Sequence, residues 1–204
     1  MTDRPIIMQG HSVRAMLDGS KTQSRRLAWR FVPGKNPPAE HLRGKVGHYV
    51  PTTWKRLYDE WQAGQREQRL WVRESWRDAV LSYGYRYGPA YRATCLQPHV
   101  YRWRPSIHLP RLASRITLLV TDVRMQRLTE IDETDALAEG ADGPHPESWH
   151  PDAGEVGPDS YRDGFRELWD SINAKRAPWD SNPDVIAISF VAHQTNIDSM
   201  DEAA

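Results

Sequence analysis

Cysteine is almost absent from this chain, which has only Cys95 among its 204 residues. A single thiol forms no internal disulfide, and it lacks the neighbouring cysteines that a thiolate zinc site requires. Long apolar stretches are also missing. No run approaches the roughly 18 residues of a membrane-spanning helix, and residues 1–10 lack the apolar centre of a secretory signal. We therefore predict a cytoplasmic protein that does not bind membranes.

Net charge is missing too, because 27 basic residues balance 27 acidic residues, but the two signs are separated along the chain. Residues 1–127 contain 23 lysines and arginines against 9 acidic residues, whereas residues 128–204 contain 4 against 18. The basic part is rich in arginine and tryptophan, a mixture that suits phosphate contacts and stacking on bases. Two explanations stay open: the basic part binds nucleic acid, or it faces the acidic part across one fold.

Hydrophobic periodicity predicts both strands and helices. Strand patterns occupy residues 5–8, 70–73, 91–94, 115–123 and 184–192. Helical patterns occupy residues 11–17, 54–62, 130–139 and 161–173. The last helix places one apolar face toward a core, formed by Tyr161, Phe165, Leu168, Trp169 and Ile172.

These elements predict an α+β fold, a small mixed β-barrel with short helices packed on it. We expect a single domain over residues 1–193. Segments rich in proline and glycine near residues 27–69 and 142–160 indicate peripheral insertions. Residues 194–204 have no periodicity, which predicts a disordered tail.

The segment DGSKTQSRR, residues 18–26, combines a helix stop, a lysine, hydroxyl side chains and two arginines. Composition alone indicates a basic loop. The segment also closely resembles the G-x-K-T-x-[ST]-x-R signature of the ASCH domain, a branch of the PUA-like superfamily of nucleic-acid-associated β-barrels. The matching residues are Gly19, Lys21, Thr22, Ser24 and Arg26.

Further segments extend the resemblance. LWVRESW (70–76) looks like a strand segment of the family, and WRPSIHLP (103–110) is similar to the WRPSIHMP segment of bacteriophage ASCH proteins. LTEIDETDALAEGA (128–141) resembles their helix motif, and LWDSIN (168–173) also fits this phage and prophage subgroup. The resemblance implies a PUA-like barrel that associates with RNA or another nucleic acid, in a bacterial host cytoplasm if a phage encodes it.

Small bacterial ASCH members are N4-acetylcytidine amidohydrolases that use a lysine, a threonine and a glutamate. Residue by residue, the resemblance implies Lys21, Ser24 and Glu139 as the catalytic groups. Serine in place of threonine keeps the nucleophilic oxygen but loses the methyl group that restricts its rotamer. Because this chain is about twice as long as those enzymes, the resemblance does not carry over their substrate.

The residue types suit amide hydrolysis. Ser24 could attack the carbonyl carbon, Lys21 could take its proton if burial lowers the lysine pKa, and Glu139 could orient Lys21 or protonate the leaving amine. In a regular strand, however, residues 21 and 24 point to opposite faces. Lys21 must then lie in the turn before the strand, or a bulge must intervene. Otherwise Thr22, beside Arg26, is the better hydroxyl.

Other side chains are candidates for binding a substrate or nucleic acid. These are Thr22, Arg25, Arg26, Arg73, Glu74, Trp76, Arg104, Ser106 and His108. Each also has an ordinary structural explanation, such as an internal ion pair for Glu74. His145 and His150 are five residues apart and match no zinc pattern, so we predict no metal and no other cofactor.

Three functions remain open at this point. The first is recognition of a nucleobase or nucleic acid with hydrolysis of an amide on an acylated base or nucleoside. The second is a noncatalytic RNA- or DNA-binding module, and the third is a phage accessory protein that docks another protein. The expected partner is therefore nucleic acid or a modified nucleoside, and the sequence does not indicate an oligomeric state.

The charge separation generates a first prediction. If the net charge of +14 over residues 1–127 binds phosphates, affinity for labelled RNA or DNA falls steeply with salt, by about 10³-fold or more between 50 and 200 mM for at least six phosphate contacts. Titrations of single- and double-stranded forms at both salt concentrations measure this slope. Absence of binding to every form at low salt contradicts the prediction.

Overall fold

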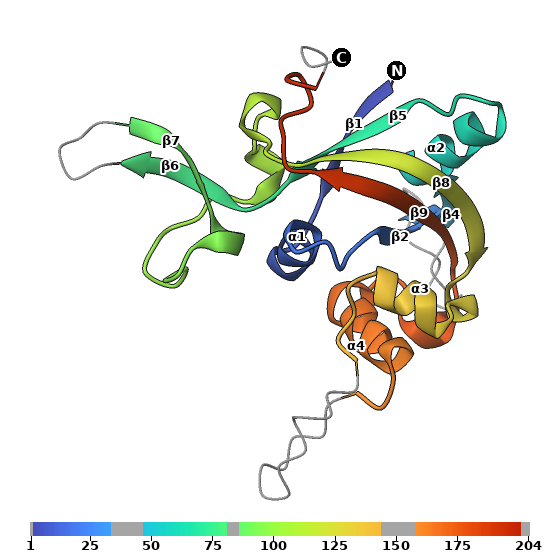
Figure 1. The fold of residues 1–204 in the computed structure, drawn as a ribbon. Coiled ribbons are helices and arrows are strands. Elements are labelled where there is room, and N and C mark those ends of the chain that lie inside the picture. Colours follow the sequence, from blue (N-terminus) through green and yellow to red (C-terminus); the bar gives the residue numbers. More distant parts are fainter. Residues whose placement is uncertain (1, 34–46, 81–85, 144–157, 201–204) are drawn as a thin grey trace, which may run out of the picture.

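The computed structural model describes residues 2–33, 47–80, 86–143 and 158–200, and a five-stranded sheet forms its centre (Figure 1). The strand order is β1 (Thr2–Ile7), β5 (Gln68–Arg73), β8 (Thr117–Arg127), β9 (Asp184–His193) and β2 (Gln23–Leu27). β1 pairs with β5 in parallel, and the other neighbouring strands are antiparallel. The predicted α+β class is confirmed.

The predicted closure of the sheet into a barrel is not observed. β1 and β2 are the two edges of the sheet, and no strand in the described ranges pairs them. A side chain links these edges instead, because Arg26 Nη2 on β2 donates to the main-chain oxygen of Ile7 on β1 over 2.8 Å. Hydrogen-bonded neighbouring strands lie about 4.8 Å apart. β1 and β2 are connected through the length of an arginine side chain, so their main chains are farther apart than two paired strands. The open edges leave room for a cleft.

A first hydrophobic core packs against the sheet, and the two longest described strands, β8 and β9, supply six of its 17 buried residues. Their register shifts by one residue between Val120 and Asp122, a bulge that bends the pair. The sheet buries Leu118, Ile186, Ile188 and Phe190 on one face. The helix α1 (Gly10–Leu17) packs Val13 and Met16 into the same core.

The predicted peripheral insertion over residues 27–69 is wrong in its second half. The helix α2 (Thr53–Gln62) buries Leu57 and Trp61 in the first core. These residues lie one helical turn apart and share a face, so the helix is anchored to the sheet. The segment also contains the paired strands β3 (Trp29–Pro33) and β4 (Gly47–Pro51). Residues 34–46 lie outside the described ranges.

A second hydrophobic cluster lies below the sheet in Figure 1, around α3 (Glu133–Ala138) and α4 (Tyr161–Asn173). The predicted bounds of α4 are confirmed, and Phe165 and Trp169 are buried. Leu168 and Ile172, however, line the cleft rather than the core. α3 is shorter than predicted, because Asp132 caps it by accepting from the Asp135 amide.

The strands β6 (Trp76–Val80) and β7 (Arg86–Tyr91) form a hairpin that projects from the sheet (Figure 1). The strand predicted over residues 91–94 is wrong, because the chain forms a 3-10 turn over Arg92–Thr94. The Tyr91 hydroxyl donates to the Ala113 carbonyl and holds this turn against the next segment.

The predicted disordered tail is wrong for residues 194–200. Ile197 is fully buried, and the Asn196 side chain donates to the carbonyls of Arg111 and Ser114. Specific hydrogen bonds and one apolar anchor order a segment without periodicity, which pattern analysis cannot detect. Residues 201–204 and most of the segment predicted as an insertion over 142–160 lie outside the described ranges.

Trp169 tests the second cluster. Its side chain is only 4% exposed, and its indole nitrogen donates to the Ala177 carbonyl over 2.8 Å. Trp169→Ala should lower the free energy of unfolding by about 3–5 kcal/mol, as measured by denaturant titration. Leu112→Ala is the control, because Leu112 is 84% exposed and its loss should change stability by less than about 0.5 kcal/mol. Equal stability of the two variants contradicts the assignment of Trp169 to a core.

Candidate active site

The three residues proposed for catalysis lie on the wall of one cleft of about 1820 Å³. Lys21 lies in the turn before β2, Ser24 lies within β2, and Glu139 caps the end of α3. Lys21 Nζ donates to Glu139 Oε2 over 2.8 Å and to the Glu139 carbonyl over 2.5 Å. The sequence allowed either a bulge in the strand or a position for Lys21 in the turn before it, and the structure shows Lys21 in the turn.

A close approach of three backbone segments positions Lys21 beside Glu139. The Lys21 amide donates to the carbonyl of Ala15 in α1, and the next amide donates to the carbonyl of Ala138 in α3. Gly140 makes this contact possible. Its φ is +68°, and a Cβ there would lie 2.9 Å from the Ala15 Cβ and 3.3 Å from the Lys21 Cβ.

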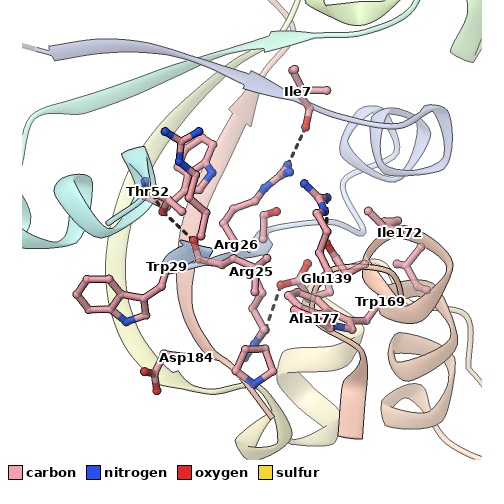
Figure 2. A pocket seen from close by; sticks show the side chains of 18 of the residues that line it. Ile7, Arg25, Arg26, Trp29, Thr52, Glu139, Trp169, Ile172, Ala177 and Asp184 are labelled. Carbon is pink, nitrogen blue, oxygen red and sulfur yellow. Dashed lines mark hydrogen bonds and ion pairs between the residues drawn. The ribbon is translucent and has the colours of Figure 1, made fainter. Parts of the chain in front are cut away.

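Arg25, predicted as a binding residue, lines the cleft and forms ion pairs with two acidic side chains. Its side chain is fully buried, and Nη1 donates to Glu139 Oε1 over 3.2 Å while Nη2 donates to Asp135 Oδ2. Both carboxylate oxygens of Glu139 are thus occupied, one by Lys21 and one by Arg25. Arg25 therefore orients Glu139 toward Lys21, and Figure 2 shows Arg25 beside Glu139 at the cleft.

Burial lowers the pKa of Lys21, although the neighbouring Glu139 carboxylate opposes this effect. The positive charges of Arg25 and Arg26 lower this pKa further. A larger share of the Lys21 amine is therefore neutral than for a lysine in water, and only a neutral amine can accept a proton. A lowered pKa is the direction of shift that a lysine acting as a general base requires.

Arg26 lines the cleft on the opposite side from α4. Figure 2 shows its guanidinium reaching toward Ile7, and it also lies over the Trp54 ring at 5.6 Å. Within the described ranges its Nε has no hydrogen-bond partner. Arg26 therefore remains a candidate donor to an anionic group.

Thr22 is not the cleft hydroxyl. It precedes β2, is exposed, and does not line the cleft, so the face predicted for residues 22, 24 and 26 does not extend to it. Its main chain instead donates to the Ala138 carbonyl and accepts from the Phe190 amide. Ser24 lines the cleft and, among the described residues, its hydroxyl has no hydrogen-bond partner.

The remaining predicted binding residues do not line this cleft. They are Arg73, Glu74, Trp76, Arg104, Ser106 and His108. Glu74 is 2% exposed and accepts both Nε and Nη2 of Arg115, over 2.8 and 3.0 Å. This pair confirms the internal ion-pair explanation, with Arg115 as the partner.

The others hold the segment that follows the β6 and β7 hairpin. Arg73 donates to the Ile107 carbonyl, and Trp76 exchanges main-chain hydrogen bonds with Arg104. The Arg104 guanidinium also pairs with Asp78 over 2.8 Å. Ser106 and His108 lie in a short 3-10 turn where His108 is exposed. The positions of these residues in the sequence did not indicate that they lie outside the cleft that contains Lys21.

Sequence analysis missed much of the cleft wall. Its lining contains eight lysines and arginines against two acidic residues, with Arg30, Arg56, Arg127, Lys175 and Arg176 beyond the central group. Trp29, Phe31, Tyr49 and Trp54 form an aromatic part of the wall. Lys175 and Arg176 belong to the acidic end of the chain, so overall charge counts concealed them. His11 and Ser12 were also missed.

No protein-family model, curated protein or solved structure matches this chain. The functional argument therefore depends on the geometry of the cleft.

No three His, Cys, Asp or Glu side chains gather as a possible metal site within the described ranges, and His145 and His150 lie outside them. Over the same ranges, none of the helices is long and apolar enough to cross a membrane.

The glycine contacts generate a prediction about the site. Gly140→Ala should lower the free energy of unfolding by about 1–3 kcal/mol more than Gly19→Ala, because the added methyl group collides with Ala15 and Lys21. Gly19 is a matched control: its φ is +86°, but nothing lies within 4 Å of the position that an added methyl group would take. Denaturant titration compares the two variants. Equal losses would show that the backbone conformation alone requires Gly140.

Proposed function

We propose that this cleft binds an acylated nucleobase or nucleoside and hydrolyses its amide, as an ASCH-type protein of the PUA-like superfamily. The observation that carries the proposal is the buried contact between Lys21 Nζ and Glu139 Oε2, 2.8 Å apart, in a cleft that Ser24 also lines. Lys21 and Glu139 are 3% exposed, and 118 positions separate them in the sequence. Burial lowers the pKa of Lys21, and a lysine perturbed in this way within a cleft is a candidate catalytic group.

In the proposed reaction, Ser24 Oγ attacks the carbonyl carbon of the amide and its proton moves to neutral Lys21 Nζ. The carbon–nitrogen bond then breaks, and the proton on Lys21 moves to the leaving amine. Water hydrolyses the acyl ester on Ser24 by the same proton route, which releases the carboxylic acid. Glu139 holds the lysine, and Arg26 donates to the oxygen on which negative charge develops.

The cleft wall also suits recognition of the base. Trp29 and Trp54 line the cleft, and because Lys55 and Arg26 lie over one face of these rings, a base would stack on the opposite face. Arg30 and Arg56 line the same cleft and would contact phosphates. Leu168 and Ile172 of α4 add apolar side chains to the lining of the cleft. This combination fits a flat heterocycle that carries a polar or charged substituent.

A noncatalytic RNA- or DNA-binding module is the second candidate. The excess of eight basic over two acidic side chains along the cleft favours it, because such an excess attracts a polyanion whether or not chemistry follows. Turnover separates the two functions. A phage accessory protein that docks another protein has no comparable support in the cleft.

The hydrolytic mechanism predicts which variants lose activity. Lys21→Ala, Ser24→Ala and Glu139→Gln should each abolish release of cytidine from N4-acetylcytidine or of the amine from a related acylated nucleoside, because groups that act as a unit fail together. Ser24→Thr should retain activity. Chromatography of a panel of acylated nucleosides measures the products. In the wild type, kcat/KM should increase as pH rises through the lowered pKa of Lys21, below its ordinary 10.5, because the base must be neutral.

Thr22→Ala is the matched control, since Thr22 is an exposed hydroxyl two positions from Ser24 and should be dispensable. Circular dichroism checks that each variant is folded. Full activity of Lys21→Ala on any converted substrate would contradict the assigned roles. A wild-type protein that binds nucleic acid but converts no substrate would favour the second candidate.

A further inference from the structure

The first turn of α1 contributes two side chains to the same cleft. His11 and Ser12 both line it, and His11 Nε2 lies 3.0 Å from Ser12 Oγ. Ser12 is 7% exposed and is therefore a buried residue of the cleft wall. Neither residue takes part in the reaction proposed for Lys21 and Ser24.

Helix geometry places this pair close to Lys21. His11 and Ala15 are four residues apart and therefore share a face of α1. The Ala15 carbonyl accepts the Lys21 amide over 2.9 Å, and Ala15 also faces Gly140. His11 thus lies one helical turn from the contact that anchors Lys21.

Burial lowers the pKa of His11, and the positive charges of Lys21 and Arg14 lower it further. Asp142, which follows α3, acts in the opposite direction. The imidazole is therefore mainly neutral near pH 7. A neutral ring has one nitrogen without a proton, and in the tautomer protonated on Nδ1, Nε2 accepts the hydrogen bond from the Ser12 hydroxyl.

We propose that Ser12 and His11 form a second nucleophile and base pair, which reacts with acyl esters or phosphonyl groups that enter the cleft. The pair has the contact that activates a serine, because the hydroxyl lies within hydrogen-bond distance of its base. Ser24, by contrast, has no hydrogen-bonded base among the described residues. The inference goes beyond the amide hydrolysis proposed above and does not depend on it.

The step is a simple displacement. As Ser12 Oγ forms a bond to the acyl carbon or phosphorus, its proton moves to His11 Nε2. The bond to the leaving group breaks, releasing an alcohol or phenolate from an ester or fluoride from a fluorophosphonate. The proton on His11 then passes to that leaving group or to water, which restores the neutral imidazole.

A fluorophosphonate probe on the full chain tests the pair directly. Trypsin cleaves after Arg14, Lys21 and Arg25, so Ser12, Ser20 and Ser24 fall in three different peptides. We expect the label on Ser12, located by tandem mass spectrometry. The labelling rate should rise with pH through a midpoint below the ordinary histidine value of 6.5, because Lys21, Arg14 and burial outweigh Asp142.

Variants give the second measurement. Ser12→Ala should remove the label, and His11→Gln should slow labelling by about a hundredfold, because glutamine accepts a hydrogen bond but not a proton. Ser20→Ala is the matched control in an exposed turn and should label at the wild-type rate. The wild-type measurement locates the label without any variant, so a variant that fails to fold does not decide the result.

The outcomes separate this inference from the proposed function. A label on Ser24 instead of Ser12 overturns the inference and strengthens the role of Ser24 in hydrolysis. Absence of any label on folded wild-type protein also overturns it, as does an unchanged rate in His11→Gln. A label on Ser12 in a protein that converts no acylated nucleoside supports the pair while contradicting the proposed hydrolysis.

Discussion

The buried ion pair between Lys21 and Glu139 is the interaction on which the candidate site depends. Removing two charges from water is costly, and their attraction offsets this cost only when the remaining hydrogen bonds are also made. Here Arg25 Nη1 pairs with the second carboxylate oxygen of Glu139, and Arg25 Nη2 pairs with the Asp135 carboxylate. Loss of one member would leave an uncompensated charge in the interior, at a cost of about 3–5 kcal/mol.

This network requires α1, the turn before β2 and α3 to meet closely. Hydrogen bonds between main chains fix the meeting point, and a glycine at position 140 removes the side chain that would separate α1 from α3. The same contact places the first turn of α1 beside Lys21. Two serines, Ser12 and Ser24, therefore share one cleft although different elements carry them.

The open sheet explains why a cleft is present. β1 and β2 do not pair within the described residues, and the long side chain of Arg26 crosses between them. A closed barrel would have filled this space with a strand ladder and apolar side chains. In the observed arrangement the space is lined by an excess of basic side chains and by aromatic rings.

Hydrophobic periodicity predicted the helices and strands whose own sequence shows which of their faces is buried. The amphipathic face of α4 and the β-branched run of β9 indicated their positions, because periodicity reports which side of an element is buried. The same approach failed at residues 194–200, where isolated hydrogen bonds and Ile197 order the chain without a repeating pattern. It also treated residues 27–69 as peripheral, although Leu57 and Trp61 of α2 reach the core.

For the site, the sequence by itself determined that Lys21, Ser24 and Arg26 lie within one short segment, and the motif pointed to Glu139 as their partner. Only the tertiary structure decided what the two arginines contact: Arg25 pairs with Glu139 and Asp135, and Arg26 donates to the Ile7 carbonyl. Arg25 and Arg26 are neighbours, and a strand sends successive side chains to opposite faces, so chemistry alone could not separate them. The tertiary structure also added His11 and Ser12, because a cleft gathers side chains by distance in space, which no spacing along the chain records.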